Sequence, residues 1–234
     1  MKNKGRILHG KAAQAREKEE FSKSLTFNDD ALFSYDAEND ALGFSEGIAC
    51  RSITLRVYAN LKNSKRLLIL AKYEMLASVD LARQSGNKKA LALPLYNLAE
   101  IQEDLREFDE AVKNYKEAIQ NMEDNPPDSH NRPSVLADMK IHLETCEYKA
   151  GDKSALERAT QALKELEQTK EPSKYNKDVW VSGGYMRIAD AIKNDNPDRA
   201  KECLQEAKMI IDYNPDLILR KKQWNKLSAS FFKK

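Results

Sequence analysis

The chain has 234 residues, which is enough for one large domain or two small ones. Lys and Arg total 39 against 37 Asp and Glu, so the chain lacks the basic surplus typical of nucleic-acid-binding proteins, and we expect no nucleic-acid partner. Only 8 Gly and 7 Pro occur, which disfavours an all-β fold rich in turns and predicts an all-α protein with long helices.

Cysteines and apolar segments indicate the compartment. Cys50, Cys146 and Cys203 are odd in number and form no C-x-x-C pair, so we interpret them as buried thiols in a reducing compartment. The basic N-terminal residues are not followed by the apolar stretch of a signal peptide. No run approaches the about 20 apolar residues of a transmembrane helix. We therefore expect a cytoplasmic protein.

A repeated pattern predicts helix pairs along the chain. It consists of a small residue, an apolar residue and a second small residue, spaced 4 and 3 positions apart. Its copies are Ala71, Met75 and Ser78; Ala111, Tyr115 and Ala118; Ala155, Ala159 and Ala162; and Ala200, Leu204 and Ala207. A weaker copy, Ser24, Asn28 and Ala31, has Asn at the apolar position. The last members lie 47, 40, 44 and 45 residues apart, longer than the common repeat of about 34.

Turn residues set the predicted boundaries. We expect helix pairs at 5–38, 40–85, 87–124, 134–170 and 175–212 within a single domain, 1–234. The segment 125–133 should be a loop because consecutive prolines cannot lie inside a helix. Pro94 should kink or restart the helix that contains it. A last helix, 214–232, is predicted to begin at Asn214 and Pro215, a capping residue followed by proline.

The third pair carries the most specific motif. Leu98 and Ala99 lie in its first helix, Phe108 follows at the turn, and Ala111 and Tyr115 lie in its second helix. This arrangement resembles the tetratricopeptide-repeat (TPR) family, in a variant with long helices. The resemblance implies an α-solenoid of about five antiparallel helix pairs and a C-terminal capping helix, about 11 helices in all.

No constellation in the sequence indicates catalysis. His9, His130 and His142 are scattered, and none has metal-ligand spacing with Cys or Glu. Gly-rich phosphate-binding loops are absent from the sequence, and the many carboxylates fit the solvated surface of helices. We therefore predict a protein that is not an enzyme, with no catalytic residue, cofactor or metal site.

Two local features each allow two interpretations. Gly183 and Gly184 lie inside a predicted helix, where each costs about 1 kcal/mol relative to Ala. They indicate either a close helix crossing or a groove that the backbone of a ligand approaches. The last helix carries a charge of about +5, counted from residue 214. Its pattern fits a capping helix with one solvated face, or a basic amphipathic helix that contacts a membrane or an acidic partner.

The resemblance also implies a concave groove lined by the first helix of each pair. Its candidate residues are Tyr96, Glu100, Glu103 and Asp104 in the third repeat; Asp138, Ile141, Thr145 and Tyr148 in the fourth; and Gly183, Met186, Asp190 and Lys193 in the fifth. The Lys and Asn pattern by which chaperone-binding members hold a C-terminal carboxylate is absent. Because five of the candidate positions are acidic and only Lys193 is basic, we expect a basic or mixed ligand segment.

The leading functional prediction is a non-catalytic scaffold that binds a peptide or helix of a partner protein in this groove. One alternative is a phosphopeptide adaptor like the 14-3-3 proteins, for which only Tyr185 and Arg187 are candidates. Another is a regulatory domain that acts beside a separate catalytic chain.

Overall fold

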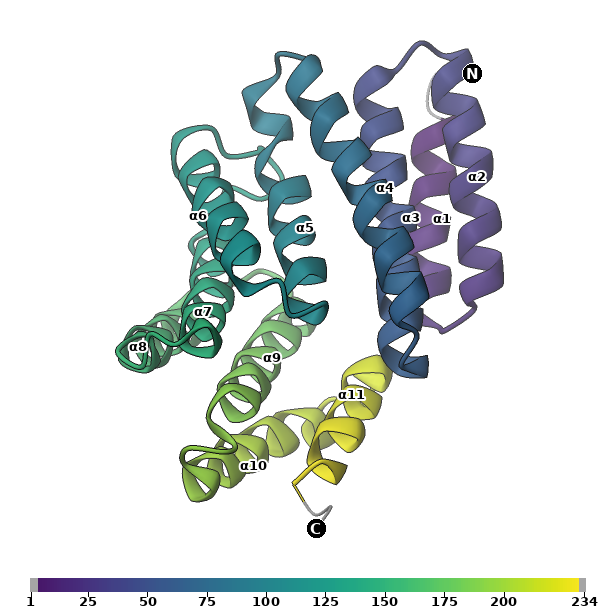
Figure 1. The fold of residues 1–234 in the computed structure, drawn as a ribbon. Coiled ribbons are helices and arrows are strands. Elements are labelled where there is room, and N and C mark those ends of the chain that lie inside the picture. Colours follow the sequence, from purple (N-terminus) through teal and green to yellow (C-terminus); the bar gives the residue numbers. More distant parts are fainter. Residues whose placement is uncertain (1–3, 232–234) are drawn as a thin grey trace. The chain divides into compact units, whose positions relative to one another are not determined.

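The computed structural model describes residues 4–231, which form eleven α-helices, one short 3₁₀ helix and no strand (Figure 1). The elements are α1 (Lys4–Glu17), α2 (Phe21–Ala37), α3 (Ala41–Lys62), α4 (Lys65–Gln84), η1 (Lys88–Ala90), α5 (Ala92–Asp104), α6 (Phe108–Asp124), α7 (Pro133–Ala150), α8 (Ala155–Gln168), α9 (Lys174–Ile192), α10 (Pro197–Tyr213) and α11 (Ile218–Ala229). The predicted all-α class, with five helix pairs and one further helix, is confirmed.

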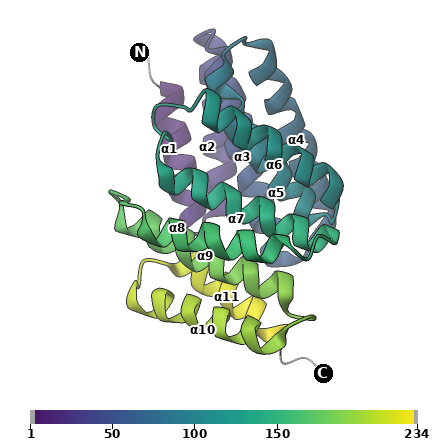
Figure 2. The ribbon, with the colours of Figure 1, turned by 90° about the vertical axis from the view of Figure 1, so that its left-hand side faces the viewer.

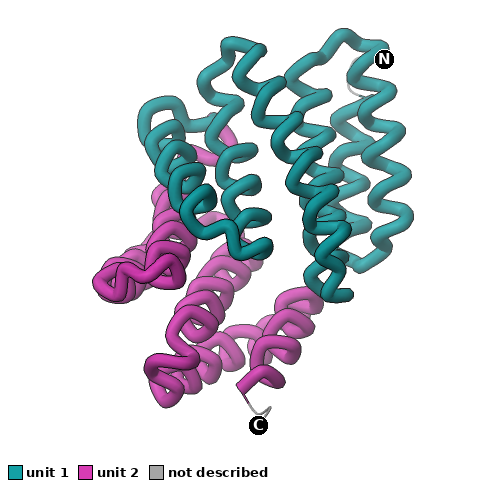
Figure 3. The backbone as a smooth tube through the Cα atoms, in the orientation of Figure 1, with its two compact units in different colours: residues 1–127 teal, residues 128–234 magenta. Residues whose placement is uncertain are grey.

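The chain forms two compact units, Met1–Pro127 and Asp128–Lys234 (Figure 3). Unit 1 contains α1 to α6, and unit 2 contains α7 to α11. The boundary lies inside the segment that the consecutive prolines predict to be a loop. That the whole chain behaves as a single domain stays a prediction.

Unit 1 consists of three helix pairs, α1 with α2, α3 with α4, and α5 with α6. The small residues of the repeated pattern bring the two helices of a pair together, since Ala31, Ala71 and Ala111 have no exposed surface. Between α3 and α4, serine hydroxyls supplement this contact. Ser45 Oγ donates to the Ser78 carbonyl and Ser78 Oγ to the Ser45 carbonyl, both at 2.9 Å. These reciprocal bonds satisfy buried polar groups.

Tyr35 of α2 fixes the packing of α1 against α3. Its ring is fully buried, and glycines from both neighbouring helices lie against it. A Cβ on Gly5 would come within 2.6 Å of the ring, and one on Gly43 would come closer still. Glycine is therefore required at both positions because a methyl group would overlap the ring.

The turns of unit 1 repeat one backbone feature. A residue with positive φ follows α1, α2, α3 and α5, namely Glu19, Asn39, Asn63 and Arg106, with φ from 52° to 66°. Such a left-handed residue ends a helix abruptly and permits a tight reversal of the chain. Arg106 lies at the turn that the third-repeat motif predicts.

Pro94 does not kink a helix. The short helix η1 ends at Ala90, and α5 begins at Ala92, so Pro94 is the third residue of α5. Amide groups in the first turn of a helix have no intrahelical partner, so the missing N–H of Pro94 costs nothing there. The helix therefore restarts before Pro94, which is one of the two outcomes that the sequence predicts.

Unit 2 consists of the pairs α7 with α8 and α9 with α10, followed by α11 (Figure 2). Its core includes Ala159, Leu166 and Ile188, whose side chains are almost completely buried. Gly184 lies at the crossing of α9 with the first pair, where a Cβ would come within 2.9 Å of Leu163 and 3.2 Å of Ile141. The close-crossing interpretation of this glycine is thus supported by its contacts.

The last helix starts later than the sequence predicts. Asn214 does not cap α11; its carbonyl accepts from the Leu217 amide at 3.2 Å in a turn that precedes Ile218. A four-residue turn is needed there because Leu217 enters the core of unit 2 and is 2% exposed. Helix α11 ends at Ala229, and the predicted end at Phe232 lies outside the described residues.

Candidate functional site

We call α1, α3, α5, α7, α9 and α11 the first helices. The helices paired with α1 to α9, which are α2, α4, α6, α8 and α10, are the second helices.

Between α3 and α5, one arginine joins two carboxylates. Arg56 Nη1 lies 2.6 Å from Glu100 Oε2, and its Nε donates to Asp104 Oδ2 at 2.6 Å. Asn60 Nδ2 donates to the same Asp104 oxygen at 2.7 Å. We call these four residues the α3–α5 cluster. With one cation and two carboxylates, it carries an excess of one negative charge.

Two of the predicted groove residues of α5 lie elsewhere than expected. Glu103 is buried, and Oη of Tyr115 on α6 donates to its carboxylate at 3.0 Å. The Glu103 side chain faces the interior, where its carboxylate provides the acceptor that the buried Tyr115 hydroxyl needs. Tyr96 is half-buried, with its ring centroid 5.6 Å from that of Tyr115. Of the four predicted positions, the structure brings only Glu100 and Asp104 together in a charged cluster.

The corresponding junction of unit 2 has the opposite charge. Asp190 of α9 accepts from Lys149 of α7 at 2.6 Å and from Lys193 at 2.8 Å. Burial raises the pKa of Asp190, but the two ammonium groups outweigh burial and hold the pKa at about 2. We call these three residues the α7–α9 cluster. With one carboxylate and two cations, it carries an excess of one positive charge, and it contains two predicted residues, Asp190 and Lys193.

The other predicted positions of unit 2 are mainly structural. Met186 and Ile141 are buried in its core and do not line a surface. Thr145 is buried and donates to the Ile141 carbonyl of its own helix at 2.8 Å. Tyr148 is 5% exposed, and its hydroxyl donates to Asp195 at 2.7 Å. Motif position predicts that these residues line the groove. In the structure, however, α7 and α9 direct them toward the interior of unit 2.

Gly183, predicted as a groove residue, is covered by a side chain of α11. Arg220 Nη2 would lie 3.0 Å from a Cβ at this position, and it donates to the Val179 carbonyl at 3.0 Å. Its Nη1 donates to Gln223 at 2.7 Å. The guanidinium thus joins α11 to α9, and the absent side chain of Gly183 makes room for it.

The residues of the phosphopeptide alternative do not converge. Tyr185 and Arg187 are two positions apart on α9, so they point to opposite sides of the helix. Tyr185 Oη donates to Glu167 at 2.7 Å, and burial together with this bond raises the pKa of Tyr185. A phosphate at Tyr185 would meet the Glu167 carboxylate, so this geometry gives no phosphate pocket.

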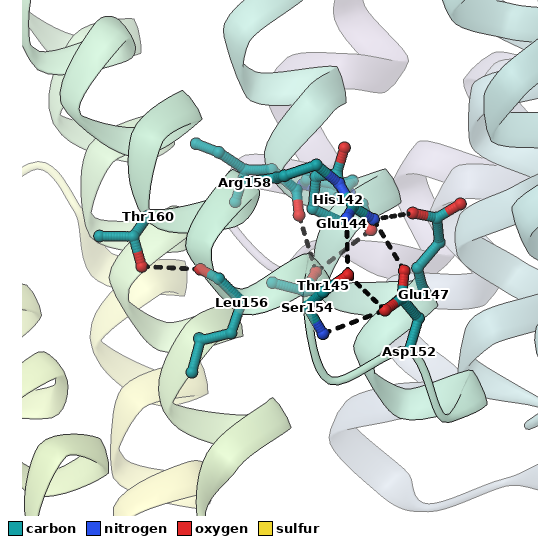
Figure 4. A network of polar contacts seen from close by, with 10 residues as sticks. His142, Glu144, Thr145, Glu147, Asp152, Ser154, Leu156, Arg158 and Thr160 are labelled. Atoms are coloured by element: carbon teal, nitrogen blue, oxygen red, sulfur yellow. Dashed lines mark hydrogen bonds and ion pairs between the residues drawn. The ribbon is translucent and has the colours of Figure 1, made fainter.

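A polar network of unit 2 fixes the turn between α7 and α8 (Figure 4). Arg158 donates to Glu144 at 2.6 Å, to Glu147 at 2.7 Å and to Asp152 at 3.0 Å. An open cavity of about 940 Å³ lies beside it, lined by side chains of both charges from α7, α8 and α10. Because three carboxylates surround Arg158, this arginine is poorly suited to attract an anion into the cavity.

Metal-binding groups and membrane helices were sought among residues 4–231. No group of three or more His, Cys, Asp and Glu side chains that could hold a metal ion occurs in this part of the chain. Within the same range, no helix combines the length and the apolar composition needed to cross a membrane.

Solved structures of other proteins have a similar fold. The chain is similar to BtubC from P. vanneervenii, with 17% identity and a TM-score of 0.62 over 86% of this chain and 77% of that one. It is also similar to a putative kinesin light chain with nearly identical TPR-like repeats from Podosopora anserina, with 12% identity and a TM-score of 0.60 over 90% and 97% of the two chains. The fold is TPR-like.

The chain is also similar in fold to a Rap protein complexed with competence and sporulation factor. Identity is 13% and the TM-score 0.61, over 98% of this chain and 65% of the Rap chain. No family model matches the sequence, and no curated protein matches it. At these identities the similarity concerns the TPR-like fold alone.

Sequence reasoning missed Arg56 and Lys149, the cations that join neighbouring first helices, and Arg220 on α11. Arg56 lies 44 positions from Glu100, and Lys149 lies 41 positions from Asp190. A search for opposite charges at equivalent positions of successive first helices would have found these pairs. Arg220 was missed because it lies among other basic residues of a helix whose basic face the sequence predicts to be solvated.

Proposed function

We propose that the protein is a non-catalytic interaction scaffold that binds a peptide or helix of a partner protein along the exposed faces of its first helices. The observation that carries the proposal is the charged cluster at the α3–α5 junction and its counterpart at α7–α9. In each, ion pairs between neighbouring first helices hold charged groups in fixed positions at a half-buried surface. Fixed groups lose less side-chain entropy when a ligand binds.

Each cluster also indicates the ligand charge that it would meet. The α3–α5 cluster presents two carboxylates beside one guanidinium, which favours a Lys or Arg of a ligand. The α7–α9 cluster presents two ammonium groups beside one carboxylate, which favours an Asp or Glu. The Rap protein, which has a similar fold, is complexed with competence and sporulation factor, so a protein of this fold can bind a partner molecule.

Site-specific photo-crosslinking in the cells that produce the protein tests the proposal. Asn97 of α5 lies one turn before Glu100 and is half-exposed, so a photo-reactive residue there should crosslink to a partner. We expect one protein partner, crosslinked through a segment that contains at least one Lys or Arg.

The matched control is the same photo-reactive residue at Lys113, an exposed position of the second helix α6 in the same pair. It should yield little of the adduct found from position 97. Equal crosslinking from both positions would contradict binding on the first helices. If no protein associates and a small molecule stabilises the fold instead, the scaffold proposal fails.

A further inference from the structure

Helix α11 occupies the place of a first helix without a second helix beside it. It packs against both α9 and α10, as α9 packs against both α7 and α8. In each of the five earlier pairs, a second helix packs beside the first helix. Among the described residues of unit 2, no helix follows α11 to pack beside it in the same way. The pattern of the fold therefore leaves a helix-sized position beside α10 and α11.

A groove lies at this position. Its apolar walls are Leu204 and Met209 of α10, Trp224 of α11, and Phe231 just beyond it, and its volume is about 580 Å³. Trp224 is held in place because its indole Nε1 donates to the Leu204 carbonyl at 2.8 Å. Met209 is 54% exposed, which is unusual for a large apolar side chain in a helix. The groove is thus apolar, preformed and open.

The surroundings of the groove are basic. Lys201 and Lys208 lie in its rim, and Lys221 on α11 is close enough to Asp212 to lower the pKa of that carboxyl, although the Lys208 hydrogen bond to Asp212 is the larger cause. Helix α11 itself contains four basic residues and no acidic one. Lys201 and Lys208 pair with aspartates of their own helix at exposed positions, where an ion pair contributes little. These lysines can therefore pair with acids of a ligand.

Several apolar residues in and just before α11 pack inward, although Ile218 at its start is 56% exposed. Leu217, Trp224 and Leu227 pack against the core of unit 2. To insert them into a lipid surface, α11 would have to detach from α9 and α10 and break the Arg220 bond to the Val179 carbonyl. The basic charge of α11 is therefore better matched by an acidic protein segment than by a bilayer.

We propose that the groove between α10 and α11 binds an amphipathic helix of a partner protein, whose apolar face enters the groove and whose acidic flanks meet the surrounding lysines. The bound helix would lie beside α11 as each second helix lies beside its first helix. This surface is separate from the first-helix clusters, so its test is independent of the function proposed above.

A displayed library of helical peptides, about 18 residues or 27 Å long, provides the probe. Leucine is fixed on one face, and Glu, Lys, Gln and Ala vary at the remaining positions. Selection on the full chain should enrich peptides rich in Glu. In the Trp180→Phe background, Trp224 is the remaining tryptophan, so binding of an enriched synthetic peptide should change its fluorescence.

Two substitutions localise the binding. Met209→Asp places a charge in the apolar wall, and Lys208→Glu reverses a rim charge; each should weaken binding of the enriched peptide by about tenfold or more, equivalent to about 1.4 kcal/mol. Phe33→Asp, at a 77% exposed position of α2 in unit 1, is the matched control and should leave the affinity unchanged. Circular dichroism melting curves should show that all three variants fold, because the replaced side chains are exposed.

Several results would overturn the proposal. It fails if no peptide is enriched, if the enriched peptides are basic or neutral, or if Met209→Asp binds them as tightly as the unaltered chain. It fails equally if the chain sediments with vesicles containing phosphatidylglycerol and Met209→Asp abolishes that sedimentation, since the surface would then bind lipid.

Discussion

The two first-helix clusters occupy corresponding places in the two units and carry opposite charge. At the α3–α5 junction, a single Arg56 neutralises part of the charge of Glu100 and Asp104. At the α7–α9 junction, a single Asp190 neutralises part of the charge of Lys149 and Lys193. In both units an ion pair joins successive first helices, but the sign of the excess charge in the cluster differs. The sign is therefore available to specify a ligand.

The two clusters should differ in how strongly they depend on their central residue. In unit 1 the outer groups are carboxylates on short side chains, 13% and 24% exposed, and they cannot move far from each other. In unit 2 the outer groups are lysines, whose flexible stems let the ammonium groups turn to solvent. Loss of the central charge should therefore be costlier in unit 1.

The largest effect is expected for Arg56→Met. This change leaves Glu100 and Asp104 facing each other without their cation, and we expect the free energy of unfolding of unit 1 to fall by about 2–3 kcal/mol. Urea unfolding followed by far-UV circular dichroism measures it. Glu100→Gln added to Arg56→Met should recover part of the loss, because it removes the repulsion. Arg83→Met, which breaks an exposed pair with Glu117, should cost less than about 0.5 kcal/mol.

The same experiment tests whether the chain is a single domain. Trp180 and Trp224 are the two tryptophans, and both lie in unit 2, so tryptophan fluorescence reports the unfolding of unit 2 alone. If the chain unfolds as one cooperative domain, Arg56→Met should shift the fluorescence transition together with the circular dichroism transition. A shift in circular dichroism without one in fluorescence would contradict the single-domain prediction.

A smaller effect is expected for Asp190→Asn in unit 2. We expect a loss of about 1–2 kcal/mol, because the lysines lose their shared acceptor but can extend into water. Fluorescence-detected urea unfolding measures the change. Asp216→Asn replaces an exposed carboxylate in the same unit and should remain within about 0.5 kcal/mol of the unaltered chain. A larger loss of stability for Asp190→Asn than for Arg56→Met would contradict the expectation that the α3–α5 cluster depends more strongly on its central residue.

The sequence predicts the helix pairs better than the surface between them. Tyr115 and Ala118 are fully buried because the spacing of small and apolar residues along one helix determines which side meets its pair mate. That spacing is local, so it can be recognised in the sequence. Glu103 shows the limit, since its burial depends on a hydroxyl of another helix. Asp190, Lys193 and Glu100 follow from motif position, but motif position within one repeat does not point to Arg56 or Lys149, because each belongs to a different repeat from the carboxylate with which it pairs.

Arg220 is a second residue whose position depends on a contact with another helix. Its sequence neighbours indicate a solvated basic face, but its guanidinium lies over Gly183 on α9. A space left by a glycine in one helix and an arginine that fills it from another are visible only once both helices are placed. Gly183 and the basic last helix, which are two separate features in the sequence, thus meet in one contact in the fold.

The smallest effect concerns the pH dependence of the same aspartate. The pKa of Asp190 is about 2 in the folded chain against an ordinary value of 3.8, so the carboxylate stabilises the fold above pH 3.8, and this contribution is lost as the pH falls toward 2. The stability difference between the unaltered chain and Asp190→Asn should therefore stay constant from pH 7 to about 5. It should then shrink to a few tenths of a kcal/mol near pH 2, where protonated Asp190 resembles Asn. Urea unfolding across this range measures the difference, in which the titration of all other carboxylates cancels. A difference that persists unchanged to pH 2 would show that the two lysines do not hold the Asp190 charge, and the contrast with the α3–α5 cluster would then lose its electrostatic basis.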